Sequence, residues 1–190
     1  EAGTITYGGS CSSDNTSATI DNNTVTFNAL ADGTYDNCTI TVTDSASNAS
    51  STLDVNTFVI DTTAPTVSSF YPTDNQSGIS ITTDNITVTF SEVMDNTSVT
   101  TNTDNTTCYG SFALSSDNFS SCIQMSSSPS SSNSDKTFTV DPSDNLSYST
   151  TYKIRVTTGV KDTAGNTLGS QYETSTGFTT VPPPEWAQEA

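Results

Sequence analysis

The sequence predicts an all-β protein built as two tandem β-sandwiches. Ser and Thr fill roughly a third of the 190 positions, well above ordinary usage. Thr favours strands because it is β-branched, whereas Ser and Asn favour turns. Only 31% of the residues are apolar, yet they form short alternating runs such as Ile86-Thr87-Val88-Thr89-Phe90. Such runs, without long stretches of Ala, Leu, Glu and Lys, favour strands over helices.

Strand candidates alternate with turn clusters at short spacing, which is typical of a sandwich. The first set of predicted strands covers residues 4–7, 24–27, 38–42 and 53–60. The second set covers residues 66–70, 86–90, 112–114, 122–125, 137–140, 152–157 and 175–179. Turn-forming clusters lie at residues 8–9, 31–33, 74–78 and 126–135.

A boundary between two modules is predicted at residues 61–65, where Pro65 cannot donate a ladder hydrogen bond. We therefore expect a first module at 1–61, a second at 62–180 and a Pro-rich tail at 181–190. A loose internal repeat supports this division, since ITVTDSASN (40–48) recurs as IRVTTGVKDTAGN (154–166). Both copies place Asp-[Ser/Thr]-Ala-x-Asn after a predicted strand, which indicates a hairpin corner.

Four segments together resemble a known family. They are DTTAPTV (61–67), ITVTFSEVMD (86–95), TYKIRVTTGVKDTAGN (151–166) and GFTT (177–180). Over about residues 65–180 they resemble the SbsA-type bacterial Ig-like domain of S-layer and other surface proteins. Residues 31–48 are more loosely similar to another bacterial Ig-like repeat. The resemblance implies two tandem immunoglobulin-like β-sandwiches, a surface-exposed spacer or adhesin role, and no catalytic residues.

The first module is short, about 60 residues against roughly 100 for a complete sandwich, and lacks the opening strand of such repeats. Two interpretations stay open, a fragment boundary at this point or an opening strand supplied by another chain. The chain begins with Glu1-Ala2-Gly3 rather than Met, so we expect a processed or excised segment.

The charge balance argues against several partners. The chain has 21 acidic and 4 basic residues, a net charge of −17, which repels phosphate backbones and anionic lipid headgroups. No apolar stretch approaches the roughly 20 residues of a membrane span. We therefore expect no nucleic acid as a partner and no direct membrane insertion.

The residue types also argue against catalysis. The sequence has no His, which removes the commonest general base. Glu92 and Asp95 lie close in sequence but follow a predicted strand, and an acidic pair on a surface loop is mostly solvated. Lys153, Arg155 and Lys161 are expected to balance nearby acidic groups. The sequence thus predicts a protein that is not an enzyme.

Four cysteines, Cys11, Cys38, Cys108 and Cys122, predict two disulfides and an oxidising, extracellular compartment. A zinc site would need all four across two modules, because there is no His and no Cys-x-x-Cys pair. Of the three possible pairings, 11–38 with 108–122 keeps each bridge inside one module.

The most informative motif is Asp-Asn-x-Ser/Thr. In every Asp-Asn pair, the second residue after the Asn is Ser or Thr. The asparagines of these pairs are Asn15, Asn22, Asn37, Asn75, Asn85, Asn96, Asn105, Asn118 and Asn145. Asn48 is also followed two residues later by a hydroxyl residue, Ser50, but no Asp precedes it. Nine of nine has a chance probability on the order of one in ten thousand when Ser and Thr fill about a third of positions. Turn chemistry explains Asp-Asn but not the hydroxyl, so we predict N-linked glycans.

Calcium is a weaker prediction. Asp61 in the linker, with Asp44 and Asp162 at the hairpin corners, offers the oxygen ligands that Ca²⁺ takes. No EF-hand spacing is present, and Asp residues in turns often serve only as caps. Calcium is therefore a possible cofactor.

The tail begins as a polyproline spacer at 182–184 and then carries the only Trp, Trp186, which is costly to leave in water. Trp186 packs either on a neighbouring module or, by head-to-tail assembly, on the next subunit, where the edge left open in the first module is one candidate.

These features together predict a non-catalytic structural subunit or repeat of an extracellular filament, S-layer or adhesin stalk. The alternative is an adhesive module that recognises carbohydrate or a host protein. Binding sites usually cluster exposed aromatic residues, whereas Tyr71, Tyr109 and Tyr172 are scattered in the sequence, which favours the structural role.

Overall fold

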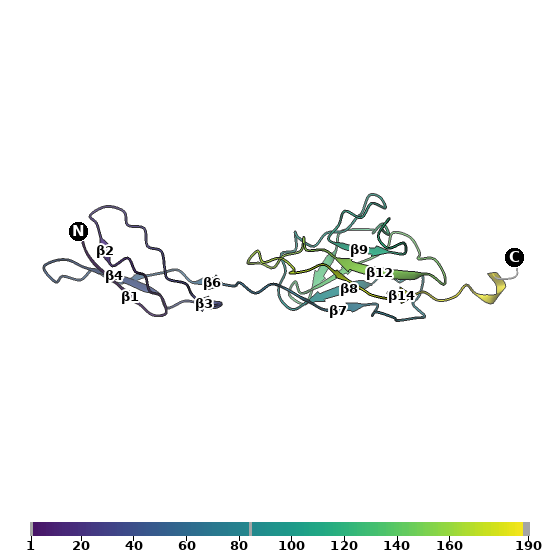
Figure 1. Cartoon of the computed structure of the whole chain (residues 1–190), viewed down its shortest axis with the longest axis horizontal. Helices are drawn as coiled ribbons and strands as arrows, with labels where there is room; N and C mark the ends of the chain where they lie inside the picture. Colours follow the sequence, from purple (N-terminus) through teal and green to yellow (C-terminus); the bar gives the residue numbers. More distant parts are fainter. Residues whose placement is uncertain (1, 84, 188–190) are drawn as a thin grey trace. The chain divides into compact units, whose positions relative to one another are not determined.

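The computed structural model describes residues 2–83 and 85–187. In that part of the chain the regular elements are β-strands, apart from a short 3-10 helix, η1 (Glu185–Ala187) (Figure 1). The chain divides into two compact units, unit 1 (Glu1–Thr63) and unit 2 (Ala64–Ala190). The all-β fold class predicted from the sequence is confirmed.

Unit 1 contains two small antiparallel sheets. The larger has the order β2 (Ser17–Ala18), β1 (Gly3–Gly8), β4 (Thr39–Thr43) and β5 (Leu53–Asp54). The smaller pairs β3 (Gly33–Tyr35) with β6 (Phe58–Ile60). The pairing of β1 with β4 runs from Thr4 opposite Thr43 to Gly8 opposite Thr39, and it is the longest in the unit.

The core of unit 1 is small. Its buried apolar side chains, within the described residues, are Ile5, Cys11, Ala18 and Cys38. Four aromatic rings form a row that is only half-buried, with ring centroids 6.2, 6.2 and 5.3 Å apart along Tyr7, Phe27, Phe58 and Tyr35. A disulfide joins Cys11 to Cys38. Because so little apolar surface is buried, the covalent bridge carries much of the stability of this unit.

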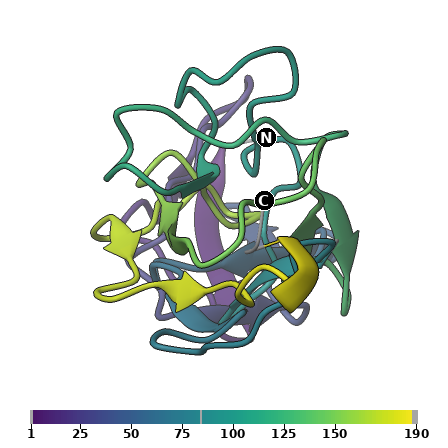
Figure 2. The ribbon, with the colours of Figure 1, turned by 90° about the vertical axis from the view of Figure 1, so that its right-hand side faces the viewer.

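Unit 2 is a larger sandwich of antiparallel strands. One sheet has the order β10 (Ser130–Ser132), β11 (Thr137–Val140), β8 (Ile86–Phe90) and β7 (Val67–Tyr71). In the other, β12 (Thr151–Val156) pairs with β9 (Phe112–Ser115), β13 (Tyr172–Glu173) and β14 (Phe178–Thr179). Long loops in teal and green join the middle strands of this unit (Figure 2).

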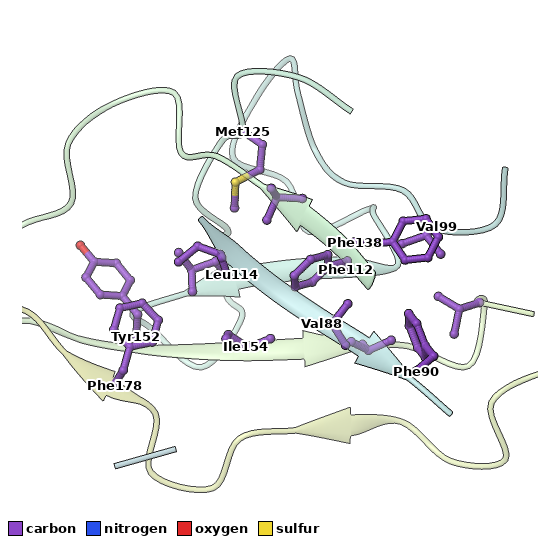
Figure 3. Packing of buried hydrophobic residues seen from close by; sticks show 14 of the residues in the cluster. Val88, Phe90, Val99, Phe112, Leu114, Met125, Phe138, Tyr152, Ile154 and Phe178 are labelled. Atoms are coloured by element: carbon purple, nitrogen blue, oxygen red, sulfur yellow. The ribbon is translucent and has the colours of Figure 1, made fainter. Parts of the chain in front are cut away.

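The two sheets of unit 2 enclose its core. Along β8 the side chains alternate between buried and half-buried, which places Ile86, Val88 and Phe90 inside. The same alternation along β12 buries Tyr152, Ile154 and Val156. Figure 3 shows Val88, Phe90, Tyr152 and Ile154 in the interior together with Phe112 and Leu114 of β9 and Phe138 of β11. The period-two pattern in the sequence is thus the cause of the core.

The outer face of β9 is also covered. Ala113 packs with Phe119 and Cys122, and a disulfide joins Cys122 to Cys108. The Arg155 guanidinium lies 3.6 Å from the centroid of the Phe119 ring. The loop closed by this disulfide therefore forms a small second core on the outside of the sheet.

Two predicted strands are wrong. Residues 24–27 form no ladder, because the Asn15 Nδ2 and the Ser13 hydroxyl donate to the carbonyls of Thr24 and Thr26. Residues 122–125 form no strand either, since their N–H groups donate to three different segments, at Thr106, Leu114 and Asn102.

Other boundaries also differ from the sequence expectation. The predicted strand at 53–60 is divided into β5 and β6. The strands β2, β3, β10 and β13 were not predicted at all, and β10 lies in the 126–135 segment that was expected to be a turn cluster.

Candidate functional site

The ten motif asparagines lie on the surface. Every one is exposed, namely Asn15, Asn22, Asn37, Asn48, Asn75, Asn85, Asn96, Asn105, Asn118 and Asn145. Asn75 and Asn118 adopt positive φ angles of 62° and 55° in tight turns. By contrast Asn102, which is outside the motif, is 0% exposed and donates to the carbonyls of Asn105 and Ile123.

The hydroxyl two residues after each of these asparagines has a structural use at only two sites in the described part of the chain. The Ser50 hydroxyl donates to Ser51 O and accepts from Val42 N. The Ser98 hydroxyl donates to Asp95 O at 2.7 Å and accepts from Lys161 N at 3.0 Å. The other eight hydroxyls make no hydrogen bond with described residues. Local folding therefore does not account for the invariant Ser or Thr.

At five of the sites the acidic residue before the asparagine accepts hydrogen bonds through its carboxylate, namely Asp14, Asp74, Asp95, Asp104 and Asp117. Asp117 accepts from the Ser121 and Ser115 hydroxyls, and Asp74 accepts from residues 175–177. The hydrogen bond from the Ser121 hydroxyl, followed by that from its N–H, lowers the pKa of Asp117 to about 2. The Ser175 hydroxyl is the main cause of the lowered pKa of Asp74. At these sites the Asp therefore has local or tertiary hydrogen bonds, whereas most of the hydroxyls have none with described residues.

The two predicted hairpin corners share the hydrogen bonds from the N–H and the side-chain amide of the Asn four residues after the Asp, and differ in the third. Asp44 Oδ1 accepts from the N–H groups of Ala46 and Asn48, and Asp44 Oδ2 accepts from Asn48 Nδ2 at 2.9 Å. Asp162 Oδ1 accepts from the N–H groups of Gly165 and Asn166, and its Oδ2 accepts from Asn166 Nδ2 at 2.8 Å. Each carboxylate therefore organises its own turn.

The calcium candidates have different surroundings. Asp44 and Asp162 both cap turns, and Asp162 is 1% exposed. Asp61 Oδ1 accepts from Thr63 N at 3.0 Å. Within unit 2 a carboxylate oxygen of Glu92 lies within 4.8 Å of one of Asp162. Oxygen ligands suit a hard cation such as Ca²⁺, and calcium binding stays a prediction.

Three of the four basic residues of unit 2 pair with acidic ones, and the fourth, Lys136, donates to the Ser91 carbonyl. Arg155 binds Glu173 at 3.0 Å, and Lys153 lies 3.8 Å from the same carboxylate. Lys161 lies 3.5 Å from Asp95. The three paired cations lie on β12 and the loop after it, where they offset local negative charge.

The exposed aromatic residues are few. Trp186 in η1 is 80% exposed, and Tyr71 and Tyr109 are 43% and 53% exposed. Tyr172 is half-buried against Phe70. Residues 188–190, the end of the predicted tail, lie outside the described residues. Within 2–83 and 85–187 no helix has the length and apolar character of a membrane span.

Sequence reasoning identified the ten asparagines as glycosylation candidates but missed two features of the site. It did not separate the engaged hydroxyls of Ser50 and Ser98 from the others, and it missed the Asp74 contacts with residues 175–177. The bonds of Ser98 to Lys161 and of Asp74 to residues 175–177 join segments far apart in sequence, for which the local sequence carries no signal. The Asp44 corner was the exception, because its repeat at Asp162 is visible in the sequence.

Comparison with known proteins identifies the class of protein that this sandwich represents. Residues 61–180 match the bacterial Ig-like domain family, and the chain belongs to that family. The comparison with curated proteins gave no match.

Solved structures of an S-layer protein are also similar. The N-terminal part of the bacterial S-layer protein SbsC is 24% identical with a TM-score of 0.43, covering 64% of this chain and 24% of that one. Domains 1–6 of surface layer protein SbsC are 25% identical with a TM-score of 0.43, covering 65% and 14%. The chain therefore spans about a quarter or less of the length of these structures.

Proposed function

We propose that this chain is a non-catalytic structural part of an extracellular surface structure, such as an S-layer, filament or adhesin stalk, and that it carries N-linked glycans. Membership of the bacterial Ig-like family supports the structural role. Two disulfides support an oxidising compartment outside the cytoplasm. The mechanism is mechanical: sandwich modules closed by covalent bridges resist unfolding, and glycans shield the backbone from proteases.

The observation that carries the glycan proposal is the combination of exposed asparagines with unused hydroxyls. All ten motif asparagines are exposed, and eight of the ten hydroxyls make no hydrogen bond with described residues. A glycosyltransferase reads this hydroxyl together with the asparagine, which gives the pattern a reason that folding does not supply.

Head-to-tail assembly is part of the same proposal. Trp186 is 80% exposed, and an indole in water favours association because burial removes its apolar surface. Its partner in a second copy is the half-buried aromatic row of unit 1, Tyr7, Phe27, Phe58 and Tyr35. The net charge of −17 opposes association between copies, so salt should promote it.

Labelling of intact cells tests the structural role. An antibody against the purified chain, viewed by immunogold electron microscopy, should decorate the outer surface of the cells that make it. Label confined to the cell interior would contradict the proposal.

Substitution of the tail tests assembly. Trp186→Ala should abolish oligomers seen by light scattering, whereas Tyr148→Ala, at a residue that is 41% exposed outside the tail, should retain them. Equal oligomers in the two variants, or a wild-type chain that stays monomeric at high salt, would refute head-to-tail assembly.

A further inference from the structure

N-glycosylation makes chemical demands that the folded chain meets at some sites only. Asn Nδ2 must bond to C1 of the sugar while the bond from C1 to a phosphate oxygen of a glycosyl diphosphate donor breaks. The diphosphate leaves with the electron pair of that bond, and Nδ2 loses a proton to a base. Nδ2 must therefore be available to react, and the hydroxyl two residues later must be available to the transferase that recognises it. Hydrogen bonds that hold either group within the folded acceptor protein oppose the transfer.

Two of the ten sites have both groups engaged. At the first, Asn48 Nδ2 donates to Asp44 Oδ2, and the Ser50 hydroxyl bonds to Ser51 O and Val42 N. At the second, Asn96 Nδ2 donates to Asp135 Oδ1 at 3.1 Å, and the Ser98 hydroxyl bonds to Asp95 O and Lys161 N. Ser98 also donates to Lys161 O, which closes a contact between segments 63 residues apart.

The role of Asn48 has an internal comparison. Asn166 makes the same bond to Asp162 in the second copy of the corner, and Asn166-Thr167-Leu168 has no hydroxyl two residues on. The turn therefore requires this asparagine whether or not the motif is complete. Asn48 is thus a structural residue that falls in the motif.

Three sites around the Cys108–Cys122 loop have both groups unengaged among the described residues. They are Asn105 with Thr107, Asn118 with Ser120, and Asn145 with Ser147. Thr106 and Asn145 line one cleft of about 250 Å³, together with Cys122 and Tyr152. Asn118 lines a separate hollow with Thr151 and Lys153, whose side chains lie on the opposite face of β12 from the buried Tyr152. The disulfide joins the segment after Asn105 to the segment after Asn118.

We propose that glycans are transferred to the folded chain, that Asn105, Asn118 and Asn145 are acceptor sites grouped around the Cys108–Cys122 disulfide, and that Asn48 and Asn96 carry none. This inference rests on the proposed glycosylation and assigns the sites that it uses. The disulfide then has a second role, because it holds two acceptor loops in position beside the cleft.

Alanine substitution of the hydroxyl residue tests each site while leaving the asparagine in place. Thr107→Ala, Ser120→Ala and Ser147→Ala, produced in the native host, should each lower the intact mass by one glycan in addition to the side-chain atoms removed. Ser50→Ala and Ser98→Ala are the matched controls, and each should lower the mass by one oxygen atom only. Glycopeptide mass spectrometry of wild-type protein, which does not depend on how any variant folds, should find sugar on Asn105, Asn118 and Asn145.

The outcomes separate this inference from the proposal beneath it. Glycans on Asn48 or Asn96, or bare asparagines at 105, 118 and 145 with glycans elsewhere, would overturn the site assignment and leave glycosylation intact. A wild-type chain without sugar at any position would overturn both.

Discussion

Asp74 and Gly177 are 103 residues apart in sequence, yet the Asp74 carboxylate accepts a hydrogen bond from the Gly177 N–H at 2.6 Å. The same carboxylate accepts from Thr176 N and from the N–H and hydroxyl of Ser175. It thereby joins the turn after β7 to the segment that leads into β14. One half-buried acidic side chain thus ties an early loop of unit 2 to its last strand.

The position of Gly177, which donates to Asp74, requires a residue without a side chain. Its φ is +88°, and a Cβ would lie 2.3 Å from Tyr152 O. Gly177→Ala should therefore destabilise unit 2 by about 1–3 kcal/mol, measured by thermal or urea denaturation. Gly169→Ala is the matched control, because a Cβ there meets nothing within 4 Å. Equal stability of the two variants would show that the close approach is not a constraint.

Asp117 predicts how the protein responds to acid. Its pKa is lowered from 3.8 to about 2 in the folded chain, first by the Ser121 hydroxyl. A carboxyl with a lower pKa in the folded state stabilises the fold above its unfolded pKa, and that contribution is lost as pH falls through the folded pKa. Thermal stability of unit 2 should therefore fall between about pH 4 and pH 2.

Titration of the Asp117 carboxyl carbon by NMR checks the cause. Wild-type protein should titrate near the low value, and Ser121→Ala should move the pKa upward because it removes the main hydrogen bond. An unchanged pKa in Ser121→Ala would assign the shift to other groups.

Arg155 holds the outer core of unit 2. Its guanidinium lies over the Phe119 ring and donates to Glu173 through two nitrogens at 3.1 and 3.0 Å. Arg155→Ala should cost about 1–2 kcal/mol in denaturation, because both contacts are lost. Lys161→Ala should cost about 0.5 kcal/mol or less, since its ion pair with Asp95 is largely solvated. A larger effect of Lys161→Ala would contradict this ranking.

Reduction should unfold the two units to different extents. Unit 1 depends on Cys11–Cys38 because its described core is small, whereas unit 2 has an extensive buried cluster besides Cys108–Cys122. The two disulfides join residues 27 and 14 positions apart, and loss of a bridge that closes a loop of such a size lowers the free energy of unfolding by about 3 kcal/mol. Amide hydrogen exchange with reductant present should show loss of protection in residues 2–63 first. Simultaneous loss of amide protection in both units would contradict the greater dependence of unit 1 on its disulfide.

The strands of the unit 2 core could be predicted because their pattern is local. The alternation at 86–90 and 151–156 appears in the sequence and in the burial of β8 and β12. The pattern failed at 24–27 and 122–125, where backbone groups bond to side chains or to several separate segments. β-propensity indicates an extended chain but does not show whether a partner strand lies beside it.

The candidate site likewise has a part that could be predicted from the sequence and a part that could not. The asparagines and their hydroxyls are a local motif, so their exposure could be anticipated from turn chemistry. The engagement of Ser98 by Lys161 joins residues 63 apart, and that of Asn96 by Asp135 joins residues 39 apart. Such contacts follow from the packing of the sandwich, so only the folded structure separates a structural asparagine from a free one.

Intact-mass spectrometry of native protein, before and after reduction, tests the central claim most directly. The account predicts a mass above that of the bare polypeptide by several glycan units, and a gain of four hydrogens on reduction, two for each disulfide. A native mass equal to the polypeptide alone would contradict the account, because the exposed motif would then have no modification to explain it.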